Sequence, residues 1–156
     1  MRSPAPNRRA LLKACLLAAA PLALAGTTPG AAQGQGSLAM KIRISFGDRD
    51  LAATLEDNPS ARDFATLLPL RDLSIDDYAN NEKISYLPRR LTEDGSGPFG
   101  DERPGDLCYY APWGNLAFFY AGYRWSRGLI RLGRIDGGFE PLRTRGKFPL
   151  RIEPLS

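Results

Sequence analysis

Aromatic, amide and guanidinium side chains gather in one short part of the chain, and these residue types are suited to binding a ligand. The cluster begins in the segment 112–115, which separates two apolar runs, and continues to residue 127. Its members are Trp113, Asn115, Tyr120, Tyr123, Trp125 and Arg127. Aromatic walls with a convergent arginine and asparagine are what a pocket for a planar or anionic small ligand would use. The alternative is structural, with Trp113 capping one end of a barrel while Trp125 and Arg127 cover its rim.

Other polar residues are weaker candidates for a ligand site. Arg62 precedes Asp63 in a predicted helix, and Lys83 lies close to Tyr86 in a predicted strap. A solvated ion pair and a half-buried aromatic side chain explain these residues as well as a site does.

The remaining acidic residues do not form a catalytic or metal-binding pattern. Asp76 and Asp77 are adjacent, so in a strand they would point to opposite faces, and we assign them turn or helix-capping roles. The acids of a later loop lack the alternating ligand spacing of a calcium site and are expected to be solvating charge: Glu93, Asp94, Asp101 and Glu102.

The chain contains no histidine and two cysteines, Cys15 and Cys108. The absence of histidine excludes histidine-based catalytic triads and histidine-ligated metal sites within the chain. Cys15 lies in a predicted leader, so a processed chain keeps one thiol and forms no internal disulfide. Without a histidine to activate it, Cys108 is expected to be a small buried side chain of a strand.

A central β-hairpin is the element expected to position the ligand cluster. Two apolar runs, 107–111 and 116–120, flank Pro112 and Gly114, which favour a turn. Alternate residues are apolar on both faces of each run, so both faces are expected to be covered. This pattern predicts a mainly β fold: a small closed barrel with one or two short helices or loops packed outside it.

Shorter elements surround this hairpin. Asn58 as N-cap and Pro59 at the first helical position begin a short helix with an apolar stripe. The stripe is Ala61, Phe64, Ala65 and Leu68. Residues 82–91 have helical spacing but are interrupted at Pro88, which predicts a single turn or an irregular strap. Strands are predicted at 41–46, 51–55, 70–75, 129–135, 139–142 and 150–153, with loops at 92–105 and 122–128.

The net charge of +4 comes from the start of the chain. Arg2, Arg8, Arg9 and Lys13 precede residue 38, and 17 basic and 17 acidic residues remain after it. A neutral folded part lacks the surplus cations that nucleic-acid binding needs. Residues 38–106 carry 9 basic and 14 acidic groups and residues 107–156 carry 8 and 3, so we expect the halves to interleave and pair across strands. A two-faced surface is the alternative.

Residues 1–37 are predicted to be a signal peptide and flexible tether, followed by a barrel domain at 38–156. Arg8 and Arg9 precede a short, weakly hydrophobic run, an arrangement that resembles a twin-arginine signal. The run is too short to span a bilayer, and Cys15 precedes the run instead of closing it as a lipoprotein cysteine would. The expected location is therefore the bacterial periplasm or the exterior, with no stable membrane anchor after processing.

Four segments in order resemble the bacterial cyclophilin-like fold family of uncharacterised proteins. They are the stretches at 57–64, 82–88, 105–120 and 129–136, and the third contains Tyr-Tyr-Ala-Pro-Trp-Gly-Asn-Leu. The resemblance runs from about residue 40 to about residue 142 and implies a compact closed β-barrel. Export leaders are not typical of this family.

The resemblance does not bring the activity of true cyclophilins with it, because function resides in a site and not in a fold. Prolyl isomerases of that group use an arginine near a Phe-x-Met-Gln segment, which is missing here, so no catalytic residue transfers. We therefore expect an exported domain that binds a small ligand or peptide, without a cofactor. The alternative is a peptidyl-prolyl isomerase with Arg127 or Arg62 in place of the usual arginine.

Overall fold

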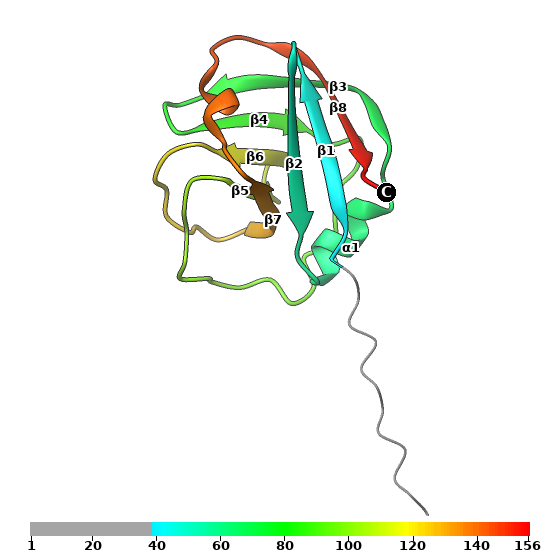
Figure 1. Cartoon of the computed structure of the whole chain (residues 1–156). Coiled ribbons are helices and arrows are strands. Elements are labelled where there is room, and N and C mark those ends of the chain that lie inside the picture. Colours follow the sequence, from blue (N-terminus) through cyan, green and yellow to red (C-terminus); the bar gives the residue numbers. More distant parts are fainter. Residues whose placement is uncertain (1–38) are drawn as a thin grey trace, which may run out of the picture. The chain divides into compact units, whose positions relative to one another are not determined.

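The computed structural model describes residues 39–156, which form a closed antiparallel β-barrel (Figure 1). The predicted mainly β barrel is confirmed, whereas the predicted leader with Arg8, Arg9 and Cys15 lies outside the described residues. Neighbouring strands around the barrel follow the order β1-β2-β7-β5-β6-β4-β3-β8, with β8 closing on β1. The strands are β1 (Lys41–Phe46), β2 (Arg49–Leu55), β3 (Leu70–Tyr78), β4 (Glu82–Tyr86), β5 (Asp106–Tyr110), β6 (Asn115–Phe119), β7 (Leu129–Asp136) and β8 (Phe148–Pro154).

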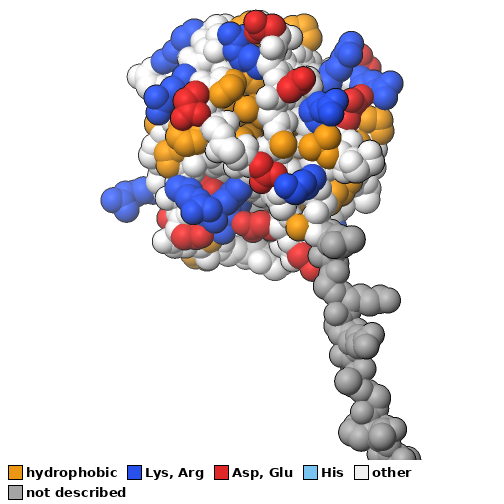
Figure 2. Space-filling view, in the orientation of Figure 1, with side chains coloured by type: hydrophobic (Ala, Val, Ile, Leu, Met, Phe, Trp, Pro, Cys, Tyr) orange, Lys and Arg blue, Asp and Glu red, His pale blue; other side chains and the backbone are white. Residues whose placement is uncertain are grey.

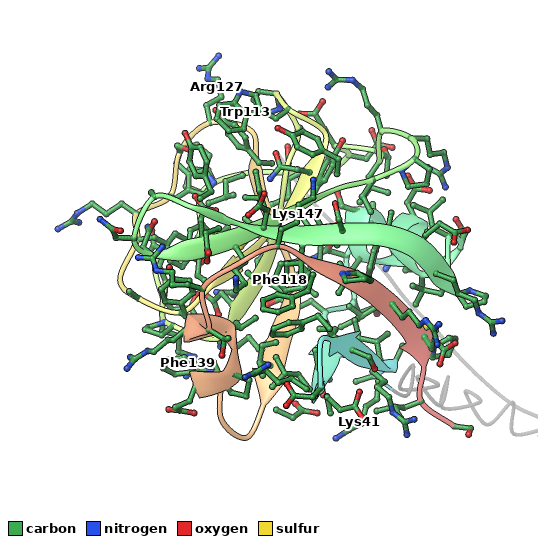
Figure 3. All side chains as sticks on the ribbon, turned by 90° about the horizontal axis from the view of Figure 1, so that it is seen from above. Lys41, Trp113, Phe118, Arg127, Phe139 and Lys147 are labelled. Carbon is green, nitrogen blue, oxygen red and sulfur yellow. The ribbon has the colours of Figure 1, made fainter. Side chains whose placement is uncertain are left out.

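The predicted central hairpin forms β5 and β6, which are covered on both faces. Leu107, Tyr109 and Phe118 fill the barrel interior, and Figure 3 shows Phe118 there. Residues with the opposite parity form a second apolar cluster on the outside, around Cys108 and Phe119. The side chains packed over this outer cluster include Phe99, Tyr110, Tyr123 and Trp125. A loop layer therefore covers the outer face of the hairpin, as the two-sided apolar pattern predicts.

The helix α1 (Pro59–Ala65) begins as expected. Asn58 is the N-cap, and its Oδ1 accepts a hydrogen bond of 2.8 Å from the amide of Ala61. The amide nitrogen Nδ2 of Asn58 donates to the carbonyl of Arg131 on β7 at 2.9 Å, which ties the helix start to the barrel. The helix ends at Ala65, so the predicted stripe residue Leu68 lies beyond it.

Two local predictions are wrong. Residues 82–86 form strand β4, not a turn or strap. The apolar pattern does not indicate this strand, because its inward residues are the polar Lys83 and Ser85 and its apolar Ile84 faces outward. The segment after Gly138 forms the 3-10 helix η1 (Glu140–Arg143), not a strand. Neither helix in residues 39–156 has the length and apolar character that crossing a bilayer requires.

The buried ammonium group of Lys83 is paired with an acidic side chain and a backbone carbonyl. Its Nζ lies 2.8 Å from Asp77 Oδ1 and donates to the carbonyl of Gly146 at 3.1 Å. Burial opposes ionisation of Asp77, but hydrogen bonds from the amide of Gly146 and from Lys83 lower its pKa. Asp76 and Asp77 both belong to β3, so their predicted turn or capping roles are wrong.

Oppositely charged side chains of residues 38–106 and residues 107–156 form ion pairs between neighbouring elements, as predicted. Arg131 on β7 pairs with Glu56 and lies 2.8 Å from Asp101, and Arg134 lies 2.7 Å from Asp106. Hydrogen bonds from Arg134 and Arg131 lower the pKa of Asp101 to about 2, so Asp101 is an ion-pair partner and not solvating charge alone. Figure 2 shows basic and acidic side chains interspersed over the visible face.

Candidate functional site

A pocket of about 290 Å³ lies on the outer face of the barrel, over strands β3, β4, β6 and β5 and beside the loop 121–128. We call it the aromatic pocket. Its polar lining residues include Glu82, Asn115 and Arg124. The aromatic side chains in its walls are Tyr78, Tyr110, Trp113, Phe119 and Tyr123.

Strand register brings these residues together from distant parts of the sequence. Tyr78 on β3 pairs with Glu82 on β4, and Glu82 pairs in turn with Phe119 on β6. Asn115 at the start of β6 pairs with Tyr110 on β5. Directly paired residues point to the same face of a sheet, so two rows of outward side chains form the floor of the pocket.

Trp113 forms one wall from the turn between β5 and β6. Its ring makes edge-to-face contacts with Tyr78, at 5.2 Å between centroids, and with Tyr110, at 5.6 Å. The indole is still 46% exposed, so much of its surface is available to a ligand. In Figure 3, Trp113 lies at the outer surface, away from Phe118 in the barrel interior.

Glu82 places a carboxyl group among these rings. Burial raises the pKa of Glu82 from 4.5 to about 7, because the apolar surroundings disfavour the charged form. Within residues 39–156, no lysine or arginine nitrogen lies within ion-pair distance of this carboxyl. A carboxyl with this pKa can hold or release a proton at neutral pH, and when ionised it carries an unbalanced negative charge.

Asn115, a lining residue of the pocket, carries a buried hydrogen-bond acceptor without a partner among the described residues. The side chain is 2% exposed, and its Nδ2 donates to the carbonyl of Leu116 at 2.9 Å. This bond fixes the orientation of the amide, because only the NH₂ group can donate to a carbonyl. The Oδ1 atom has no partner in the described part of the chain, although buried polar atoms are normally paired.

The loop that borders the pocket is held in place by several contacts. The ring of Tyr123 stacks on Phe119 at 3.6 Å, and its hydroxyl donates to the buried carboxylate of Asp106 at 2.7 Å. Burial is the main cause that raises the pKa of Tyr123. The indole nitrogen of Trp125 donates to the carbonyl of Leu129, and the backbone amide of Trp125 donates to Glu102, each at 2.9 Å. Glu102 is therefore a loop anchor and not solvating charge alone.

The buried thiol of Cys108 lies under this loop, 3.6 Å from the hydroxyl of Tyr123. Burial raises the pKa of the thiol, so the reactive thiolate is disfavoured. The prediction of a small buried strand residue is confirmed.

The ligand residues predicted from the sequence do not all line one pocket. Trp113, Asn115 and Tyr123 line the aromatic pocket, whereas Trp125 and Arg127 border a larger and more open hollow. Tyr120 faces the barrel interior, where its hydroxyl has no partner among the described residues. Arg62 lies on α1, where it pairs with Asp57 at the surface.

Sequence reasoning missed Tyr78, Tyr110 and Glu82 as pocket residues. Tyr78 and Glu82 belong to a hairpin whose second strand the sequence does not reveal, and their pairing with Phe119 depends on that strand. For metal binding, residues 39–156 contain no group of three or more acidic or cysteine side chains that could hold an ion.

Comparisons with known proteins agree with this architecture. The solution structure of the hypothetical protein AF2241 from Archaeoglobus fulgidus superposes with a TM-score of 0.62 at 16% identity, over 78% of this chain and 99% of that chain. At this identity the likeness concerns the fold alone. No curated protein matches the sequence. The model of the Cyclophilin-like family matches residues 44–153, which include all eight strands in whole or in part. The chain belongs to the Cyclophilin-like family.

Proposed function

We propose that this cyclophilin-like domain binds a small molecule, or one side chain of a peptide, in the aromatic pocket. The observation that carries the proposal is the convergence of five aromatic side chains with Glu82 and Asn115 in one pocket lining. Ligand sites are commonly apolar hollows with a few placed polar groups and volumes of about 300–1,000 Å³. The volume of about 290 Å³ is at the lower end and suits a compact ligand.

The wall contacts support binding without large rearrangement. Stacking of Tyr123 on Phe119 and the hydrogen bonds of Trp125 hold the loop before any ligand arrives. A pre-formed pocket loses less conformational entropy on binding than a mobile loop does. Arg127 and Arg62 lie outside this pocket, so the proposal does not use them, and the isomerase alternative stays a prediction.

Native mass spectrometry of the protein from its own host tests the proposal. We expect an excess mass that disappears when the same sample is denatured. Trp113→Ala removes one wall and should reduce the bound fraction. Arg127→Ala is the control, because Arg127 is exposed and is not part of the pocket lining. A bare wild-type mass, or equal loss of the adduct in both variants, contradicts binding at this pocket.

We further propose that the domain is exported through its twin-arginine-like leader, which would place the pocket in the periplasm or outside the cell. The support is the paired Arg8 and Arg9 before a short apolar run. Replacing both arginines by lysine keeps the charge and should abolish export. Undiminished export of that variant contradicts the twin-arginine route.

A further inference from the structure

We propose that the ligand of the aromatic pocket is an organic cation, an alkyl or aryl ammonium group, with Glu82 as its counter-ion. This inference rests on the proposed binding function and specifies the class of ligand.

Glu82 provides the first argument. Its carboxylate is partly buried on the outer face of β4, and within residues 39–156 no cationic group is close enough to form an ion pair with it. An unbalanced carboxylate in apolar surroundings is costly, and a bound cation would supply the missing charge. Arg124 is the other charged residue in the pocket lining, but it is exposed on the loop and forms no ion pair with Glu82.

Asn115 provides the second argument. Its NH₂ group is committed to the carbonyl of Leu116, so the atom left unpaired is an acceptor and not a donor. An ammonium group has only donors, which suits a pocket whose lining includes the acceptors of Glu82 and Asn115. An anionic group would face the negative charge of Glu82 and would offer no donor to either acceptor.

The aromatic walls provide the third argument. Ring faces of tryptophan and tyrosine attract cations through their negative π-surfaces, and Trp113, Tyr78 and Tyr110 supply such rings here. The sequence-based expectation of a planar or anionic ligand relied on a convergent arginine, Arg127. Arg127 borders the other hollow and Arg124 is exposed on the loop, so the partly buried charged group of the pocket is the Glu82 carboxylate, which favours a cationic ligand.

Three probes of similar size but different charge test the inference by amide NMR titration of the full chain. The probes are 2-phenylethylamine, which is cationic, 2-phenylethanol, which is neutral, and 3-phenylpropanoate, which is anionic. We expect the amine to shift signals of Trp113 and Asn115 and to bind about tenfold tighter than the alcohol, the effect of one favourable charge interaction. Affinity for the amine should rise from pH 6 to pH 8 as Glu82 ionises.

Two variants identify the counter-ion. Glu82→Gln should weaken the amine about tenfold and change the affinity for the alcohol less than about twofold. Glu140→Gln, which removes an exposed carboxylate on η1, should change neither. Equal or tighter binding of the alcohol or the propanoate, or no signal change with any probe, overturns the cation inference. The proposed binding function is decided separately by the bound mass in native mass spectrometry.

Discussion

Glu82→Gln should stabilise the protein at alkaline pH and leave its stability nearly unchanged in acid. The folded state keeps a proton on Glu82 up to about pH 7, whereas the unfolded chain releases it near pH 4.5. Between these values the folded state binds more protons than the unfolded state, so the free energy of unfolding falls as pH rises. The full cost of the buried carboxylate is present above pH 7 and absent below pH 4.5.

The size of the effect follows from the pKa. A rise from 4.5 to about 7 corresponds to about 3 kcal/mol at 1.36 kcal/mol per unit. Solvent contact of the partly buried side chain reduces the expected cost to about 2 kcal/mol. Glutamine has nearly the same shape and no charge, so it should recover this amount at pH 8 and almost none at pH 4.

Urea denaturation of the full chain at both pH values measures the difference. The matched control is Glu140→Gln, which changes an exposed carboxyl and should alter the free energy of unfolding by less than about 0.5 kcal/mol. If Glu82→Gln is no more stable than the wild type at pH 8, ionisation of the Glu82 carboxyl does not destabilise the folded protein. An equal gain at both pH values would mean that packing, not ionisation, is the cause.

Two further predictions concern the structure beneath the loop. Asp106→Asn should cost about 1–3 kcal/mol in urea denaturation, because it removes the charge of the fully buried acid that accepts hydrogen bonds from Arg134 and Tyr123; a loss below about 0.5 kcal/mol would contradict this role. In a Cys15→Ser background, Cys108 should resist iodoacetamide at pH 8 in the folded protein and react in urea, because burial disfavours its thiolate. Rapid labelling of the folded protein would contradict the burial of Cys108 beneath the loop.

Much of the barrel could be predicted from local patterns. Alternation in β1 matches buried Ile42 and Ile44, and the two-sided apolar runs of β5 and β6 match a hairpin covered on both faces. Asn58 and Pro59 identify the start of α1 because capping depends on residues next to one another in sequence. Local rules succeed where the stabilising partner is close in the chain.

Strand β4 could not be predicted because it turns a lysine inward, and this lysine is stabilised in part by a distant partner. A buried lysine normally argues against a strand that faces a barrel interior. Lys83 is tolerated there because Asp77 and the carbonyl of Gly146 accept its hydrogen bonds. Gly146 is 63 residues away in sequence, so the pattern of the segment 82–86 alone gives no sign of this partner.

Only part of the site could be predicted, because the site also depends on residues that are distant in sequence. The predicted cluster combined residues that follow one another in the chain, but the pocket selects residues by strand parity and register. Asn115 and Tyr120 are five positions apart along an extended run, so their side chains point to opposite faces, and they cannot share one pocket. Only the pairing of β3, β4 and β6 brings Tyr78 and Glu82 beside Phe119.

Three other acidic residues of the barrel differ from Glu82 because each has a partner. Glu56 pairs with Arg131, Asp106 lies 2.7 Å from Arg134, and Glu102 accepts the backbone amide of Trp125. These acids hold strands and loops together, and each has a partner supplied by the chain. Glu82 has none within residues 39–156, and its burial opposes its charge. A carboxylate that costs stability and pairs with no group of the described residues is what the proposed binding of a cation among aromatic rings would explain.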